Sequence, residues 1–122
     1  MLNSGTDWIV EFTDEFGEWW ECLSVEVQEK IYKVVGLLEL NGPRLSFPYS
    51  SEIKGSSIAL RELRIQCGGD PYRVLYAFDP VRHALLLIGG NKSGNDDWYE
   101  KNVPIAERLF MDHLKELKEE GI

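Results

Sequence analysis

The chain has 122 residues, 43% of them hydrophobic and 28% charged, with a formal net charge of −8 at pH 7. This composition is typical of one globular domain with a single core, and it argues against disorder. Residues 1–5 have neither the charged nor the apolar region of a signal peptide, and no apolar run approaches the roughly 20 residues that span a bilayer, so we expect a cytosolic protein.

The charge is distributed unevenly along the chain. Residues 1–52 carry a net charge of −7 and residues 93–122 carry −4, whereas residues 53–92 carry +3. A negative total disfavours non-specific binding of nucleic acid, because neutralising phosphates supplies most of that affinity. A small cationic pocket is still compatible with a negative net charge, because the local electrostatic field governs binding at a site.

Cysteine and histidine give no indication of a cofactor. Cys22 and Cys67 lie far apart in the sequence and match no metal-ligand spacing, so we expect two buried thiols. His113 falls on the apolar face of a predicted helix and is expected to be a structural histidine with a polar partner. Because the sequence has no glycine-rich phosphate loop and no paired histidines, it predicts neither a metal nor a nucleotide cofactor.

The first third of the chain predicts a short strand and two helices. Residues 8–12 place Trp8, Val10 and Phe12 on one face of a short strand. Thr13 and Ser24 are suitable N-caps for two helices. The apolar positions of the first are Phe16, Trp19, Trp20 and Leu23, and those of the second are Val27, Ile31, Val34, Val35 and Leu38. Residues 41–43, Asn-Gly-Pro, predict the end of the second helix, so the two helices are expected to form a hairpin.

A long loop and three strands follow. Residues 43–57 contain two prolines, a glycine and five serines and predict a loop. Strands are predicted over residues 59–67, 72–79 and 83–90, with turn formers at residues 68–71 and at Asp79-Pro80. The short reversals predict an antiparallel meander, and the apolar run at residues 84–88 predicts a central strand covered on both faces.

A last helix completes the predicted fold. It is expected to begin at Trp98 with Asp96 or Asp97 as its cap, and Pro104 either starts its main segment or kinks it. The order β-α-α-β-β-β-α predicts an α+β fold, in which an N-terminal helical hairpin and a C-terminal helix pack on one antiparallel sheet.

Three residues near the ends of the predicted strands suggest a chemistry. Arg73 opens the second meander strand, Lys92 follows the third, and Tyr99 begins the last helix, so we expect them at one edge of the sheet, near Arg61 and Arg64. Cations and a phenol without metal ligands suit metal-independent RNA cleavage, in which the ribose 2′-hydroxyl attacks the adjacent phosphorus. Tyrosine is a suitable base only where cations lower its pKa, and we expect Arg73 and Lys92 to do so. The same residues are also common on surfaces without a catalytic role, and the residues alone leave that alternative open.

Five runs of residues carry a resemblance to a known family: Leu60-Arg61-Glu62-Leu63-Arg64, Tyr72-Arg73-Val74-Leu75-Tyr76, Leu85-Leu86-Leu87 before Lys92, Trp98-Tyr99, and Ile105-Ala106-Glu107-Arg108. In order and spacing they resemble the RelE/HigB superfamily of bacterial toxins, most closely its HigB-like, phage-derived branch. The resemblance implies one RelE-like toxin domain over residues 1–122. It also implies an endoribonuclease that cleaves mRNA in the ribosomal A site and is silenced by a cognate antitoxin.

The resemblance assigns roles to individual residues. Arg73 matches the arginine that holds the scissile phosphate, Lys92 the cation after the last strand, and Tyr99 the catalytic position at the helix start. RelE proper has lysines where this chain has Leu60 and Glu62. Glu62 is therefore either the general base or a salt-bridge partner of an arginine.

We interpret the chain as the toxin of a type II toxin–antitoxin system that acts as a ribosome-dependent mRNA endoribonuclease without a cofactor. The predicted catalytic residues are Arg73, Lys92 and Tyr99, and the predicted RNA-binding residues are Lys54, Arg61 and Arg64. The expected partners are the ribosome, mRNA and a small antitoxin with a helix-turn-helix domain. Two alternatives remain: a ParE-like toxin that inhibits DNA gyrase by protein contact, and a catalytically decayed toxin with a regulatory role.

Overall fold

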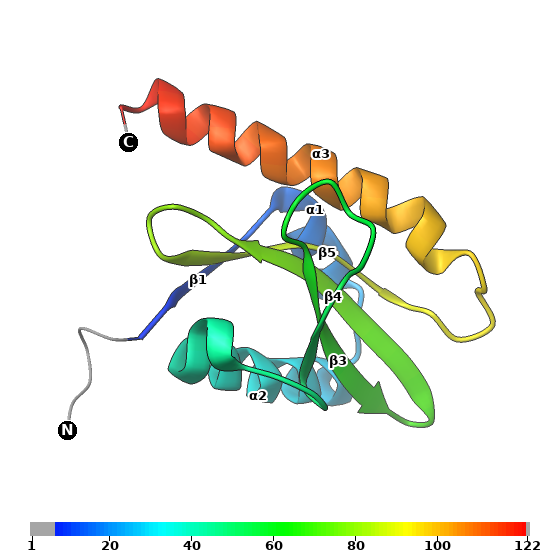
Figure 1. The fold of residues 1–122 in the computed structure, drawn as a ribbon. Helices are drawn as coiled ribbons and strands as arrows, with labels where there is room; N and C mark the ends of the chain where they lie inside the picture. Colours follow the sequence, from blue (N-terminus) through cyan, green and yellow to red (C-terminus); the bar gives the residue numbers. More distant parts are fainter. Residues whose placement is uncertain (1–6, 122) are drawn as a thin grey trace.

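The computed structural model describes residues 7–121, which form three α-helices, one short 3-10 helix and five strands (Figure 1). In chain order they are β1 (Ile9–Phe12), α1 (Asp14–Glu21), α2 (Val25–Asn41), η1 (Gly42–Arg44), β2 (Ser50–Glu52), β3 (Arg61–Cys67), β4 (Asp70–Phe78), β5 (His83–Asn91) and α3 (Trp98–Glu119). The predicted order of helices and main strands is confirmed. The expectation about residues 1–5 lies outside the described residues. No helix within residues 7–121 has both the length and the apolarity needed to cross a bilayer.

The five strands form a mixed sheet in the order β1-β5-β4-β3-β2. The meander is antiparallel as predicted, but β1 pairs parallel with β5, from Ile9 opposite His83 to Phe12 opposite Leu86. The α+β class is confirmed, and the prediction of a purely antiparallel sheet is corrected at β1. Two helices separate β1 from the meander, so no tight turn forces it to run antiparallel to its neighbour. In this position β1 gives the apolar strand β5 a neighbour on each side.

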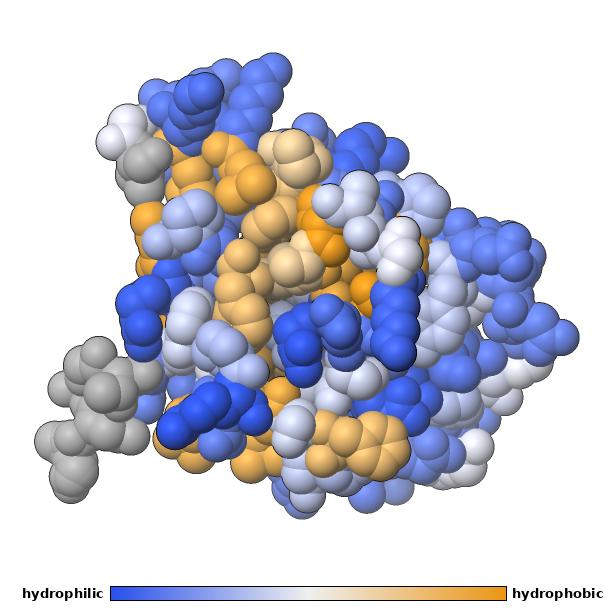
Figure 2. Space-filling view, viewed as in Figure 1, coloured by the Kyte–Doolittle hydropathy of each residue, from blue (hydrophilic) through white to orange (hydrophobic). Residues whose placement is uncertain are grey.

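Helices cover both faces of the sheet, with α1 and α2 on one side and α3 across the other (Figure 1). The core on the α1 and α2 side includes Phe16, Ile31, Leu38, Val74 and Tyr76. The core on the α3 side includes Leu75, Leu87, Ala106 and Phe110. Figure 2 shows apolar side chains beneath α3, bordered by hydrophilic ones. Because successive strand residues point to opposite faces, β4 and β5 supply both cores, as the apolar run in β5 predicted.

The predicted helix caps hold at the first two helices. Thr13 Oγ1 accepts a hydrogen bond from the Phe16 N–H at 3.0 Å, and Ser24 Oγ accepts one from the Val27 N–H at 3.3 Å. The chain leaves α2 at Gly42, whose φ of 55° is accessible to glycine without strain. These contacts fix both ends of the helical hairpin against the sheet.

The predicted loop at residues 43–57 contains two short elements, η1 and β2. β2 pairs with β3, from Ser50 opposite Leu63 to Glu52 opposite Arg61. A Ser-Ser-Glu segment has little β propensity, so pairing with β3 determines this strand rather than its own sequence. This pairing places a serine hydroxyl of β2 beside β3.

The turn between β3 and β4 is tighter than predicted. Gly68 and Gly69 have φ values of 61° and 85°, the conformation that two-residue hairpin turns require. Asp70 and Pro71, which were predicted to be turn residues, already belong to β4. The hairpin therefore extends further and fixes the register of β3 against β4.

The last helix begins at Trp98 as predicted, with Asp97 at the N-cap position but without a side-chain hydrogen bond. Of the two predicted placements of Pro104, the structure has the one inside the helix rather than at its start. Further along α3, His113 Nε2 lies 2.8 Å from Asp79 Oδ2, which confirms a structural histidine with a polar partner. α3 is thus tied to the end of β4 by a buried polar contact as well as by its apolar face.

Of the two predicted buried thiols, only one is buried. Cys67 lies in the core at the end of β3, whereas Cys22 is exposed. Cys22 is the C-cap of α1, one residue beyond the helix, and the apolar face of α1 does not include it.

Gly90 on β5 lets α3 start close to the sheet. A Cβ at Gly90 would lie 2.3 Å from Nε1 of Trp98, the first residue of α3, which is only 4% exposed. We therefore expect Gly90→Ala to lower the free energy of unfolding by about 1–3 kcal/mol, the usual cost of overpacking. Urea denaturation followed by tryptophan fluorescence measures it.

Gly36→Ala is the matched control for this experiment. Nothing lies within 4 Å of a Cβ at this position in α2. Because alanine favours helix over glycine by up to about 1 kcal/mol, the control is expected to be as stable as the wild type or more stable. Equal stability of Gly90→Ala and the wild type would contradict the close packing of Trp98.

Candidate functional site

Glu62 is a buried carboxylate near the start of β3, on the face of the sheet that α3 covers. Its side chain is 6% exposed. Oε1 accepts a hydrogen bond from the Tyr99 hydroxyl at 2.6 Å, and Oε2 accepts from Ser51 Oγ at 2.7 Å and from Arg64 Nη1 at 3.1 Å. A buried carboxylate is tolerated only where donors and cations surround it. Glu62 therefore organises the side chains that meet at this position.

Arg73 of β4 is directed at the same carboxylate. Its Nε lies 3.5 Å from Glu62 Oε1, and its Nη1 donates to the Tyr72 carbonyl oxygen at 3.0 Å. The side chain is 8% exposed, and its buried Nε makes no hydrogen bond within the described residues. The Arg73 guanidinium is thus paired with Glu62 through Nε without a hydrogen bond of good geometry, and a guanidinium is also the side chain that best matches a phosphate.

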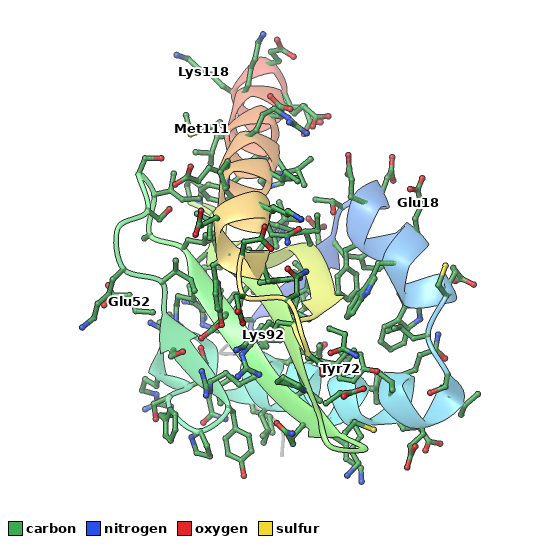
Figure 3. All side chains as sticks on the ribbon, turned by 90° about the vertical axis from the view of Figure 1, so that its right-hand side faces the viewer. Glu18, Glu52, Tyr72, Lys92, Met111 and Lys118 are labelled. Carbon is green, nitrogen blue, oxygen red and sulfur yellow. The ribbon has the colours of Figure 1, made fainter. Side chains whose placement is uncertain are left out.

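Lys92 and Tyr99 complete the cluster from the two ends of the loop between β5 and α3. The Lys92 ammonium lies 5.6 Å from the centre of the Tyr99 ring, within cation–π range. Figure 3 shows Lys92 below the N-terminal end of α3, facing the sheet. Within residues 7–121 Lys92 forms no ion pair, so its positive charge is uncompensated by a neighbouring carboxylate. We call Glu62, Arg64, Arg73, Lys92 and Tyr99 the Glu62 cluster.

The Tyr99 phenol is held in its protonated form. Burial is the largest cause of a pKa raised above the ordinary value, and the hydrogen bond to Glu62 and its negative charge raise that pKa further. Arg73 lowers the pKa by less. The expectation that cations lower the pKa of Tyr99 is therefore wrong in direction, because the phenol donates directly to a carboxylate. At neutral pH Tyr99 is a hydrogen-bond donor, not a phenolate.

This pKa is directly testable. We expect Tyr99 to titrate above pH 10 in the wild type and at lower pH in Glu62→Gln, which removes the negative charge. NMR of ¹³C-labelled tyrosine, assigned with Tyr99→Phe, measures it. Because the folded chain keeps this proton where the unfolded chain loses it, the stability contribution is complete below about pH 10 and declines above it. Glu100→Gln, an exposed acid beside Tyr99, is the control, and a Tyr99 pKa below 10 would contradict the hydrogen bond to Glu62.

Arg61, predicted to bind RNA, lies on the other face of the sheet. It precedes Glu62 by one residue on β3, so its side chain points to the α2 side. Its guanidinium donates to the Leu45 carbonyl oxygen and Ser50 Oγ at 3.2 Å each and to the Tyr76 hydroxyl at 3.3 Å. The structure does not bring Arg61 to the Glu62 cluster, and its contacts are those of a residue that holds β2 and η1 to the sheet.

Lys54, also predicted to bind RNA, lies near the cluster but among acids. It is on the rim of a groove of about 600 Å³ that includes Tyr99 in its wall. The groove also contains the carboxylates of Glu52, Glu100 and Glu107. Glu107 Oε2 holds the loop before β3 by accepting hydrogen bonds from Ser56 Oγ at 2.7 Å and the Ser57 N–H at 2.8 Å. With three acids and one lysine, this groove is a poor path for a polyanion.

Sequence reasoning left the role of Glu62 open and missed Ser51. The strand register places Arg64 directly opposite Arg73, a repulsive pair unless an anion lies beside it. Glu62 is the one acid in its predicted strand, so the sequence already indicated which residue could neutralise this pair of arginines. Ser51 had none, because its contact depends on a strand that only the folded structure forms.

The fold is that of the RelE toxins. The chain matches a double-mutant form of Escherichia coli RelE in the free state with a TM-score of 0.57 and 16% identity, covering 78% of this chain and 94% of RelE. The match to the intact E. coli RelBE complex has a TM-score of 0.53 and 18% identity, and it covers 68% of this chain and 94% of the matched chain. The match to the archaeal RelE–RelB complex from Pyrococcus horikoshii OT3 has a TM-score of 0.52 and 18% identity, and it covers 71% of this chain and 97% of the matched chain. At these identities the likeness shows the fold alone.

Sequence comparison defines the family. A family model described as phage derived protein Gp49-like (DUF891) matches residues 18–111. The chain is 38% identical over 92 residues to the provisionally named toxin HigB3 of Mycobacterium tuberculosis H37Rv, covering 74% of this chain and 79% of HigB3. It is 30% identical over 122 residues to the provisionally named toxin HigB2 of the same strain, covering 98% of this chain and 60% of HigB2, so it spans about three fifths of that relative. The chain belongs to the Gp49-like family, within the RelE/HigB superfamily of type II toxins.

Proposed function

We propose that the chain is a ribosome-dependent mRNA endoribonuclease that cleaves RNA without a metal ion and thereby inhibits translation. The observation that carries this proposal is that Arg73 and Tyr99 both contact Glu62 while the Lys92 ammonium lies over the Tyr99 ring. Family membership supports it, because the RelE/HigB superfamily that the sequence resembles consists typically of small endoribonucleases. The cluster supplies cations and a proton-transfer pair, the two things that this reaction needs.

In the proposed reaction one phosphodiester of the RNA lies against Arg73 and Lys92. The ribose 2′-oxygen attacks the adjacent phosphorus, the bond to the 5′-oxygen breaks, and a 2′,3′-cyclic phosphate forms. The guanidinium and ammonium groups stabilise the negative charge that develops on the phosphoryl oxygens. Lys92, which has no ion pair among the described residues, also donates the proton that the leaving 5′-oxygen takes.

Tyr99 and Glu62 remove the proton of the 2′-hydroxyl. Because the phenol is protonated, it accepts that proton only as it passes its own to Glu62 Oε1, 2.6 Å away. The carboxylate ends this step protonated, and exchange with water restores both Glu62 and Lys92. Glu62 is thus the base and Tyr99 the relay that reaches the substrate.

The proposed partners follow from the same family. The solved relatives include E. coli and P. horikoshii RelE, each in a complex with RelB. We extend this arrangement to a cognate antitoxin, with a helix-turn-helix domain, that covers the face bearing Arg73 and Lys92. The other partners are the ribosome and the mRNA that it translates in the cytoplasm.

Inducing the chain in a bacterium tests the proposal. We expect growth arrest together with cleavage of translated mRNA, and in a purified translation system we expect cleavage only when ribosomes are present. Arrest with intact mRNA and broken DNA would replace the proposal with the ParE-like alternative, a toxin that acts on gyrase. Full growth and intact mRNA would indicate the decayed toxin.

A further inference from the structure

A groove at the outer edge of β3 has an unusual lining for so acidic a chain. It has a volume of about 450 Å³ and lies between α2 and the loop that leads from η1 to β2. Lys30 and Lys33 of α2 and Arg64 of β3 line it, and none of its lining residues is a carboxylate. Arg64 is paired with Glu62, but Lys30 and Lys33 form no ion pair within the described residues, so in a chain with a net charge of −8 these two lysines give the groove a local field that attracts a polyanion.

Exposed aromatic rings accompany these cations. Phe47 is 70% exposed and Tyr49, which lines the groove, is 44% exposed. The Arg64 guanidinium lies 5.1 Å from the centre of the Phe47 ring, and the Arg64 N–H donates to the Tyr49 carbonyl oxygen at 2.9 Å. Both rings therefore belong to a loop that is fixed to β3, with their faces left partly free.

The groove is continuous with the Glu62 cluster through Arg64. The same guanidinium that lies over Phe47 also bonds Glu62 Oε2 at 3.1 Å. A chain of contacts thus runs from Tyr99 through Glu62 and Arg64 to the exposed aromatic rings.

We propose that this groove binds single-stranded RNA on one side of the scissile phosphodiester. Lys30 and Lys33 are three residues apart on one face of α2 and contact phosphates, while Phe47 and Tyr49 stack on unpaired bases. A duplex is excluded, because its bases are already stacked and their faces are not accessible. This inference rests on the proposed function, since it extends the substrate of the same site.

Binding of a non-cleavable RNA tests the groove. The probe is a fluorescein-labelled 2′-O-methyl oligonucleotide of about ten nucleotides, which lacks the attacking hydroxyl, and the measurement is fluorescence anisotropy at several salt concentrations. We expect Phe47→Ala/Tyr49→Ala to bind at least about tenfold more weakly, from lost stacking. Lys30→Ala/Lys33→Ala should reduce the slope of log affinity against log salt by about 1.4, or about 0.7 for each lost phosphate contact.

The matched control is Lys115→Ala/Lys118→Ala, which removes two exposed lysines at the far end of α3. It should bind as the wild type does. The inference would be overturned if both groove variants bound the RNA as tightly as the wild type, or if the wild type bound no RNA. It would also be overturned if the groove variants bound RNA normally and lost affinity only for a protein partner.

Cleavage assays separate this inference from the proposed function. If the wild type cleaves mRNA on ribosomes and the groove variants cleave and bind as well as it does, the inference fails and the proposed function stands. If the wild type binds the probe through the groove yet cleaves nothing, the proposed function fails and the RNA site stands. Circular dichroism of both double variants confirms folding, which substitutions of exposed side chains should not disturb.

Discussion

Replacing Arg73 by alanine is expected to reduce ribosome-dependent mRNA cleavage by about a hundredfold or more. Arg73 is the buried cation of the Glu62 cluster, and its Nε has no hydrogen bond within the described residues. Removing one such donor from a developing oxyanion typically costs 10²–10³ in rate. The rate is measured with purified ribosomes and a defined mRNA, by primer extension across the cleavage sites.

Two comparisons make this result specific. Arg108→Ala removes an exposed arginine of α3 and should leave the rate unchanged. Lys92→Ala should lower the rate by more than tenfold, because its ammonium both stabilises charge and protonates the leaving oxygen. Full cleavage by Arg73→Ala, in a protein that folds as the wild type does, would remove Arg73 from the reaction and with it the main support for the nuclease.

The parts of the fold that the sequence predicts are those governed by local rules. The α1–α2 hairpin has caps at Thr13 and Ser24 and apolar side chains at helical spacing, and β5 has an apolar run longer than one face requires. Nothing local encodes the parallel pairing of β1 or the short strand β2. Both depend on which strand edge is left free once the meander has formed.

The site shows the same division between local and tertiary information. The prediction that Arg73, Lys92 and Tyr99 lie close together could be made from their positions near strand ends, because the turns determine the strand register. Assigning Arg61 to the same surface failed, since the run of residues 60–64 carries charges at both odd and even positions and does not indicate which face is covered by α3. The predicted shift of the Tyr99 pKa was wrong in direction for a related reason, because its partner, Glu62, is a neighbour only in the folded chain.

Glu62→Gln is expected to lower the free energy of unfolding by about 3–5 kcal/mol, the usual effect of removing one partner of a buried ion pair. Glutamine preserves the shape of the side chain but leaves Arg73, 8% exposed, without a counter-charge. Cleavage should fall as well, because the proposed relay loses its proton acceptor. Urea denaturation at pH 7 measures the stability, and Glu100→Gln, an exposed acid of the same neighbourhood, is the control.

A double variant separates the two roles of Glu62. If the loss in Glu62→Gln arises from an uncompensated buried cation, removing that cation as well should restore part of the stability, so Glu62→Gln/Arg73→Met should unfold at higher urea than Glu62→Gln alone. The double variant should still cleave no mRNA, because the base and the phosphate-binding cation are both absent. A double variant less stable than Glu62→Gln would show that Arg73 stabilises the fold by packing rather than by its charge. Stability recovered without activity would show that the loss of cleavage in these variants does not arise from unfolding.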